Sequence, residues 1–117
     1  MYDYVAFSPD DVRISVKKQD NLEHGNLDFW YKTFMNLNVT NRGRKFIKDG
    51  DFSAKNKAGK YLVFESETNG IIHLYVIGML PMGEDKDNDI YILEAAGKKD
   101  KMETDLDAII ASFNTLK

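Results

Sequence analysis

Apolar residues recur along the chain at two different periods, and each period predicts one kind of element. Val12, Ile14 and Val16 alternate with polar residues, which indicates a half-buried strand after a short apolar run at 4–7. Three later apolar runs are also expected to be strands: 61–67, 71–80 and 90–96. Of these, 71–80 is apolar on both faces in its middle and is therefore expected to lie centrally in a sheet.

Turn residues divide the strand-rich part of the chain. Asn69-Gly70 is the strongest hairpin signal, because both central positions of a type I′ turn need positive φ, which Asn and Gly tolerate. Phe46-Ile47 marks the start of another strand. Asp49-Gly50 and Ala58-Gly59 are expected to break the region after it into turns.

Two segments show the period of an amphipathic helix. The first begins after Asn26, a suitable N-cap, and is expected to fray at 36–41. Its apolar stripe is Leu27, Trp30, Tyr31, Phe34 and Leu37. The second closes the chain, with the stripe Met102, Leu106, Ile109, Ile110, Phe113 and Leu116. The predicted class is α+β in one domain over 1–117: an antiparallel sheet of about five to six strands with two packed helices, in the order β-β-α-β-β-β-β-α.

Composition narrows the possible functions. The net charge of −3 argues against general nucleic-acid binding, and the absence of cysteine removes disulfides, thiol nucleophiles and zinc–thiolate sites. No apolar run approaches the roughly 18 residues that span a bilayer, so no transmembrane segment is expected. Met1-Tyr2-Asp3 is not the start of a signal peptide, although a removed targeting segment would leave the compartment open.

The chain carries no catalytic signature. His24 and His73 have no second histidine at ligand spacing, so both are expected to be structural or exposed. No serine lies in a G-x-S-x-G context, and no glycine-rich phosphate loop occurs. We therefore expect no catalytic residue, no metal site and no cofactor.

An acidic cluster precedes the last predicted strand and consists of Glu84, Asp85, Asp87 and Asp89. The spacing of the three aspartates is similar to the start of a calcium loop. Ile90 then stands where that loop needs glycine, and Ala96 stands where it needs glutamate. A solvated loop is the expected outcome, with weak divalent-cation binding as the open alternative.

A basic segment lies between the two halves of the chain, and the residues after it are strongly acidic. Its cations are Arg42, Arg44, Lys45, Lys48, Lys55, Lys57 and Lys60. Such a polarised surface can steer a charged partner, whereas the simpler interpretation is a solvated connection whose lysines protect a sheet edge. Phe29 lies outside the helical stripe and is expected either to be an exposed anchor or to pack under this connection.

The element order and several short stretches resemble the PsbP-like superfamily, which includes a photosystem II extrinsic protein, a Ran-binding nuclear import factor and DcrB-like bacterial lipoproteins. The matching stretches are Phe7-Ser8-Pro9-Asp10 before 12–16, the hairpin at Asn69-Gly70, Ile90-Tyr91-Ile92-Leu93-Glu94, and Ile109-Ile110-Ala111-Ser112-Phe113. The superfamily usually has more sequence before the first strand, so here an N-terminal strand is absent or the domain is cut short. No catalytic residue carries over.

The resemblance implies a non-enzymatic accessory or protein-binding domain, bacterial, extracytoplasmic and lipoprotein-like, with a lipid anchor upstream of this chain. Its expected contact surface is Arg42, Arg44, Lys45, Lys48 and Phe29. A carrier of a small apolar ligand between helix and sheet is the alternative, with a pocket of Trp30, Phe34, Phe64 and Tyr75. An NTF2-like enzyme is a third and weaker hypothesis. The partner and the oligomeric state stay open.

Overall fold

The computed structural model describes residues 4–7, 13–21, 25–82 and 89–114. Its strands are β1 (Tyr4–Phe7), β2 (Arg13–Asp20), β3 (Lys45–Ala54), β4 (Lys57–Thr68), β5 (Ile71–Pro81) and β6 (Asp89–Lys98). Its helices are α1 (Leu27–Asn36), continued by the π-helical turn η1 (Leu37–Asn41), and α2 (Lys99–Phe113). The predicted α+β class and the predicted order of strands and helices are confirmed.

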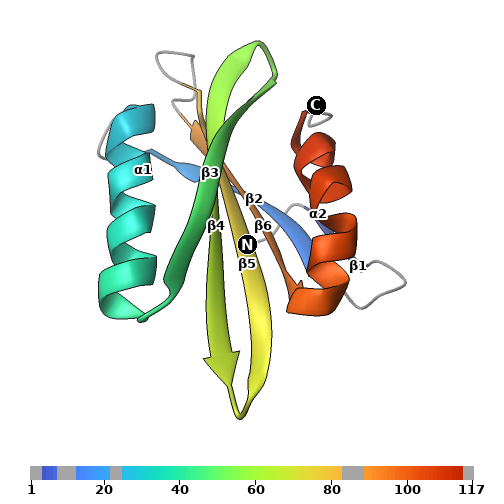
Figure 1. Ribbon diagram of the computed structural model, residues 1–117. Helices are drawn as coiled ribbons and strands as arrows, with labels where there is room; N and C mark the ends of the chain where they lie inside the picture. The colour runs from blue at the N-terminus through green and yellow to red at the C-terminus, as the bar shows by residue number, and fades with distance from the viewer. Residues whose placement is uncertain (1–3, 8–12, 22–24, 83–88, 115–117) are drawn as a thin grey trace.

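All six strands form one antiparallel sheet in the order β1-β2-β6-β5-β4-β3. After β2, helix α1 connects to β3 at the opposite edge of the sheet. Strands β4, β5 and β6 then follow in turn, so that β6 pairs with β2. Figure 1 shows the sheet nearly edge-on, with α1 on one face and α2 on the other. The central position expected for the strand at 71–80 is confirmed, because β5 lies between β4 and β6.

The face under α2 is a continuous apolar core. Phe113 of α2 is 1% exposed and meets Phe52 of β3 edge-on, with ring centroids 5.5 Å apart. Gly78 of β5 lies directly beneath, since a Cβ there would come within 2.9 Å of the Phe113 ring. Strands β2 to β6 and α2 all contribute buried members: Val16, Phe52, Ala54, Val63, Leu74, Val76, Leu80, Leu93, Ala95, Met102, Ile109 and Phe113. This core joins α2 to five of the six strands.

The face under α1 has a second core that involves fewer strands. Its buried members come from α1, β4, β5 and β6: Trp30, Phe34, Leu62, Phe64, Ile77, Met79, Ile90 and Ile92. Asn26 caps α1 as predicted, because its side-chain oxygen accepts a hydrogen bond of 2.9 Å from the Phe29 amide. Tyr31 links the helix to β3 through a hydrogen bond of 2.5 Å from its hydroxyl to Asp49.

The predicted turns at Asp49-Gly50 and Ala58-Gly59 are wrong, because both pairs lie inside strands. The turn of this hairpin is Lys55-Asn56, where both residues have positive φ, 51° and 62°. The two glycines instead make room for aromatic rings of neighbouring strands. A Cβ on Gly50 would meet the ring of Tyr61, and a Cβ on Gly59 would meet Phe52.

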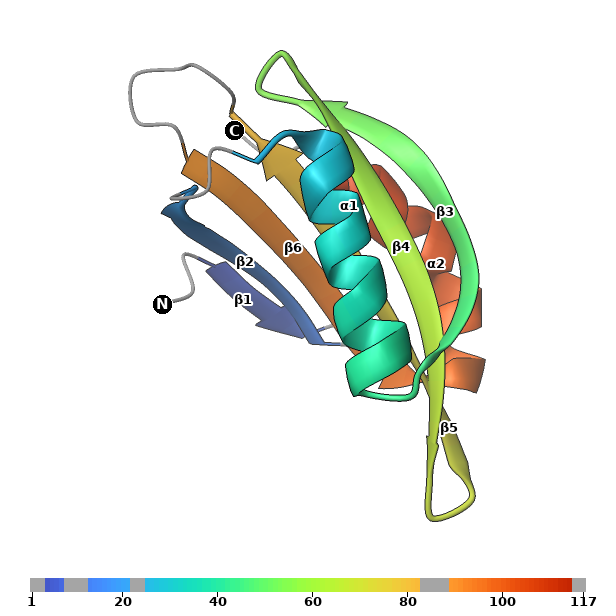
Figure 2. The same cartoon turned by 90° about the vertical axis from the view of Figure 1, so that its left-hand side faces the viewer.

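Strand β3 is an edge strand with an irregular start. The pairing with β4 shifts between Phe46 and Lys48, so Ile47 forms a bulge. Most of the strand is exposed to solvent, including Ile47 at 42%. At the Asn69-Gly70 turn, both residues have positive φ as predicted, and Figure 2 shows this β4–β5 hairpin extending beyond the rest of the sheet.

Candidate functional site: a cleft beside α1

A cleft opens between the C-terminal half of α1 with η1 and the β2–β6–β5 part of the sheet. We call it the α1 cleft, and its volume is about 430 Å³. Its lining residues are Lys17, Gln19, Trp30, Phe34, Leu37, Asn38, Arg42, Arg44, Tyr75, Ile77, Ile92 and Glu94. Pockets for small ligands span about 300–1,000 Å³, so this volume suits a small molecule or a few side chains.

The cleft exists because α1 covers only part of its face of the sheet. The helix packs on β4 and β5, and Figure 2 shows β6, β2 and β1 emerging beside it. Alternation along β2 directs Val16 to the α2 core and therefore Lys17 and Gln19 to the α1 side. Polar side chains thus occupy the part of this face that the helix leaves open.

Trp30 supplies a hydrogen-bond donor that has no partner. The side chain is 7% exposed, and its Nε1 is buried without an acceptor among the residues that the structure describes. A buried donor left unpaired costs roughly 1–3 kcal/mol. Trp30 lines the cleft together with Phe34, which it meets at a centroid distance of 5.7 Å. An acceptor that enters the cleft can therefore relieve this cost.

Positive charge dominates the cleft. Three cations line it, Lys17, Arg42 and Arg44, against one carboxylate, Glu94, so the lining carries a formal charge of +2. The whole chain has a net charge of −3. Within the described part of the chain, neither Lys17 nor Arg42 takes part in an ion pair. The cleft is therefore a positive site on an acidic molecule.

Arg44 is held in place by two neighbours. Its guanidinium stacks over the Tyr75 ring at 4.3 Å from the centroid, and its Nη1 donates to Oδ1 of Asn38. Asn38 is 1% exposed and donates from Nδ2 to the Phe34 carbonyl at 2.8 Å. The π-helical turn η1 places Asn38 at this junction, and such turns are frequent at functional sites.

The single carboxylate of the cleft lies beside a tyrosine hydroxyl. Burial and the neighbouring Glu94 raise the pKa of Tyr75, while Arg44 and Arg42 oppose the shift. Tyr75 therefore stays protonated at neutral pH and can donate its hydroxyl proton in a hydrogen bond to Glu94. Part of the negative charge of Glu94 is compensated in this way.

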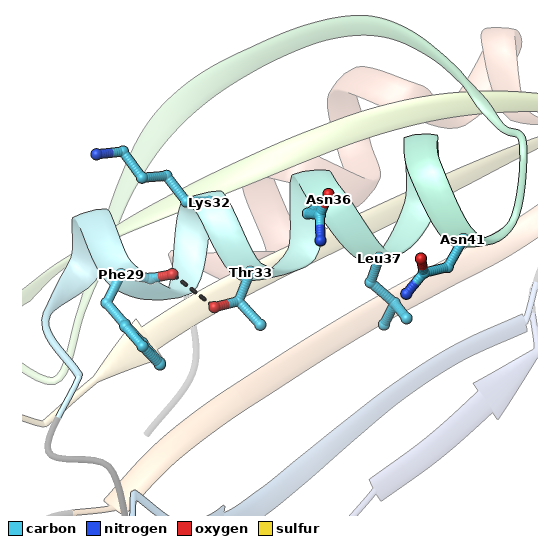
Figure 3. Close-up of a pocket in the computed structure, with 6 residues that line it drawn as sticks. All are labelled: Phe29, Lys32, Thr33, Asn36, Leu37 and Asn41. Atoms are coloured by element: carbon cyan, nitrogen blue, oxygen red, sulfur yellow. Dashed lines mark hydrogen bonds between the residues drawn. The ribbon is translucent and has the colours of Figure 1, made fainter.

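A second and shallower depression follows the outer surface of α1. This α1 groove is lined by Phe29, Lys32, Thr33, Asn36, Leu37 and Asn41. Figure 3 shows Phe29, Thr33 and Leu37 projecting from the same side of the helix. Leu37 lines both the groove and the cleft, so the two are adjacent. Phe29 is 40% exposed and meets Trp30 edge-on, which makes it an exposed aromatic residue at the start of the groove.

The predicted partner-binding cations do not form one surface. Arg42 and Arg44 line the α1 cleft. Lys45 lies opposite Glu65, whose carboxylate pairs with Lys99 of α2 at 3.1 Å, and Lys48 lies opposite Val63 of the α2 core. Since residues directly opposite in an antiparallel pair share a face, both lysines lie on the α2 side of β3.

Three of the four predicted pocket residues line the α1 cleft: Trp30, Phe34 and Tyr75. Phe64 is fully buried in the core beneath the helix. Sequence reasoning did not identify Lys17, Gln19, Asn38 or Glu94. One signal was available, because Glu94 is the only charged residue between Ile90 and Ala96, in a strand that is otherwise apolar.

The remaining candidate residues lie away from the cleft or outside the described residues. His73 is half-buried in β5, opposite Lys98 of β6 and Ser66 of β4. His24 and the acidic residues Glu84, Asp85 and Asp87 lie outside the described residues. Asp89 begins β6 and lies 3.8 Å from Lys18. In the described part of the chain, no group of three His, Asp or Glu side chains is arranged to hold a metal ion.

No family model matches the chain, and no curated protein matches its sequence. Two solved structures share its fold. Protein PA94 of Pseudomonas aeruginosa, a protein of unknown function regarded as a candidate regulator, has a TM-score of 0.69 at 13% identity, over 97% of this chain and 79% of PA94. LpqN of Mycobacterium tuberculosis, which is involved in cell envelope biogenesis, has a TM-score of 0.62 at 15% identity, over 93% of this chain and 64% of LpqN.

At these identities the comparisons show a shared α+β fold. This chain spans less than two thirds of the length of LpqN. Neither of the helices in the described residues is long and apolar enough to cross a membrane.

Proposed function

We propose that the chain is a non-catalytic accessory domain of the PsbP-like type, extracytoplasmic and lipoprotein-like, that binds its partner in the α1 cleft. The order of its elements supports the superfamily, and the shared fold with LpqN, a cell-envelope protein, supports the compartment. The residues that line the cleft support binding rather than catalysis, because its cations and its tryptophan are recognition groups.

The observation that carries this proposal is the buried, unpartnered Nε1 of Trp30, a residue that lines a positively charged cleft. A fold gains nothing from burying a donor without an acceptor, and such a donor reduces stability. The cost is justified if an acceptor from a partner completes the hydrogen bond. Phe29 and Leu37 extend the same surface along the α1 groove and offer apolar contact to a larger partner.

A carrier of a small ligand is the second candidate, favoured by the aromatic wall of Trp30, Phe34 and Tyr75. A purely apolar ligand does not suit the charged side chains on the opposite wall of the cleft. Covering Lys17, Arg42 and Glu94 with hydrocarbon would remove their hydration without replacing it, which is costly for charged groups. The ligand of a carrier would therefore need polar groups of its own.

Photo-crosslinking in the cells that produce the protein tests the proposed site. A photoreactive amino acid is placed at Gln19 or Leu37, which line the cleft, and in matched proteins at Glu103 or Ala108, which are exposed on α2. We expect a discrete crosslinked species from the cleft positions alone. Equal crosslinking from α2 would contradict the assignment of the partner surface to the cleft.

Charge reversal provides an independent test. Lys17→Glu with Arg42→Glu changes the cleft, whereas Lys45→Glu with Lys48→Glu makes the same change of charge on the α2 side of β3. We expect the first pair to abolish the crosslink from Leu37 and the second pair to leave it. Loss of the crosslink in both proteins would show that overall charge, rather than the cleft, governs binding.

A further inference from the structure

We infer that the α1 cleft binds an organic anion with an apolar body, whose acidic group is held by Lys17, Arg42 and the indole N–H of Trp30. This inference names the ligand chemistry of the cleft and rests on the proposed function of that site. Four features of the cleft favour such a ligand: its positive charge, its unpartnered donor, its hydrogen-bonded carboxylate and its apolar wall.

The cations that line the cleft have different roles. Arg44 is already engaged, since it stacks on Tyr75 and donates to Asn38. Lys17 and Arg42 have no ion pair within the described residues, and they approach the cleft from opposite sides, β2 and the end of η1. Two cations facing one space attract an anion, and their hydrogen bonds to it are stronger than those between neutral groups.

Trp30 selects for an acceptor. Its Nε1 is a donor only, so no donor group of a ligand can satisfy it. A carboxylate, sulfonate or phosphate oxygen can accept from this nitrogen while it faces Lys17 or Arg42. A ligand that is only cationic or only a hydrogen-bond donor would leave the indole unpaired and would meet repulsion from both cations.

Glu94 does not reverse this preference. Its carboxylate lies beside the hydroxyl of Tyr75 and on the same face of the sheet as the cleft cations. With Glu94 included, the lining keeps a formal charge of +2. The remaining positive charge is therefore available to a ligand.

The rest of the lining is apolar. Phe34 and Leu37 come from the helical side, and Ile77 and Ile92 come from the sheet. These side chains can cover a hydrocarbon or aromatic body, while the acidic group remains at the polar wall. The volume of about 430 Å³ limits the enclosed part to a small ligand or to the end of a longer one.

A matched pair of dyes tests the inference. 8-Anilinonaphthalene-1-sulfonate is an aromatic anion, and N-phenyl-1-naphthylamine has the same ring system without the sulfonate. Trp30 is the only tryptophan of the chain, so energy transfer from tryptophan to dye reports binding to the protein, and the variants below locate that binding. We expect saturable 1:1 binding of the sulfonate with energy transfer, and binding of the neutral dye weaker by about ten-fold or more.

Two variants locate the acidic group. Lys17→Gln with Arg42→Gln is expected to lower the affinity for the sulfonate dye by about ten-fold and to leave the affinity for the neutral dye unchanged, because only the anion contacts these cations. Lys45→Gln with Lys48→Gln removes the same charge from the α2 side of β3 and is expected to change neither dye. Equal weakening by both pairs would overturn the inference in favour of non-specific attraction.

The outcomes separate this inference from the proposed function. Equal affinity for both dyes, with energy transfer, would overturn the preference for an anion while leaving the cleft as a binding site. Absence of energy transfer from either dye, together with a crosslink from Leu37, would also overturn the inference and leave the proposed function intact. Absence of both the energy transfer and the crosslink from Leu37 would overturn the inference and the proposed function together.

Competition identifies the source of the anion. Decanoate represents a free amphiphilic acid and is compared with decanol, and N-acetyl-leucyl-phenylalanine represents a polypeptide C-terminus and is compared with its amide. Displacement of the sulfonate dye by one of the acids, without displacement by its neutral counterpart, supports the inference and identifies the source. Equal displacement by an acid and its neutral counterpart would overturn it.

Discussion

The two faces of this sheet are built from the same strands, but their apolar surfaces extend over different numbers of strands. On the α2 side, buried apolar residues continue from β2 to β3, and Phe113 of the helix packs on Phe52 of β3. On the α1 side the apolar surface ends at β6, where Ile92 borders the polar side chains of β2. One face is complete without a partner, and the other contains a cleft with an unsatisfied donor.

This difference predicts that different residues govern the stability of the protein and its binding. Positions on the α2 face are expected to govern folding, because every atom removed there leaves a cavity. Substitutions around the α1 cleft are expected to change stability less, since these positions already border an open space and are packed on fewer sides. Four predictions test this division, in order of decreasing effect.

Phe113→Ala is expected to lower the free energy of unfolding by about 3–5 kcal/mol, because the ring is 1% exposed and packs on Phe52 and Gly78. The same substitution at Phe34, which borders the cleft, is expected to cost at least about 1 kcal/mol less. Urea denaturation of both variants measures the difference. Equal costs would show that the two faces are equally closed.

Asn38→Ala is expected to cost about 2 kcal/mol, since it removes the buried hydrogen bond to the Phe34 carbonyl and takes away the Asn38 acceptor of the Arg44 guanidinium. Thr33→Ala is the control, because Thr33 makes a similar bond to the carbonyl of Phe29 but is exposed, and we expect a change within about 0.5 kcal/mol. Denaturation measures both. A large cost at Thr33 would show that helix propensity, rather than burial of the bond, sets the effect.

Trp30→Phe is expected to change stability by less than about 1 kcal/mol, because removal of the unpartnered N–H offsets the lost ring contacts. Binding of the anionic dye, followed by its own fluorescence, is expected to weaken in the same protein. A large loss of stability would indicate that the indole nitrogen has an acceptor in solution.

Tyr31→Phe is expected to have the smallest effect on the free energy of unfolding, and this effect is expected to shrink at alkaline pH. The hydrogen bond to Asp49, assisted by partial burial and by the charge of Asp49, raises the pKa of Tyr31 to about 12. Since the folded state holds this proton more tightly than the unfolded state, the stabilisation is present below pH ~10 and is lost as the pH rises toward about 12.

Comparison of urea denaturation near pH 9 and near pH 11.5 tests this dependence. The natural protein should lose more stability over the interval than the Tyr31→Phe variant does. Parallel losses in the two proteins would show that this bond contributes little to the attachment of α1 to β3.

Much of the fold followed from local periodicity in the sequence. The apolar runs of the strands and the stripes of the two amphipathic helices predicted the order of elements. The hairpin turn at Lys55-Asn56 was missed because lysine seldom takes positive φ, and Gly50 was misread because its role is to make room for the Tyr61 ring. The second error concerns a contact between strands, which local patterns do not reveal.

The cleft was harder to predict. Lys17 and Gln19 lie in a polar stretch of β2 beside the exposed Lys18 and Asp20, so nothing in the sequence distinguishes them from solvent-facing residues. Only the insertion of β6 between β2 and β5 brings them opposite α1, beside Glu94. Since strand order is a non-local property, the sequence did not reveal that Lys17 and Glu94 share this cleft with the predicted residues Trp30, Phe34 and Tyr75.

The bulge at Ile47 has a consequence for behaviour at high concentration. Strand β3 ends the sheet and presents backbone groups that another extended chain could join. The bulge interrupts its hydrogen-bonding pattern, and Lys48, Asp49 and Asp51 place charges along the same edge. A second molecule that docked there would meet an irregular register and desolvated charges, so this open-edged sheet is protected against strand-to-strand aggregation.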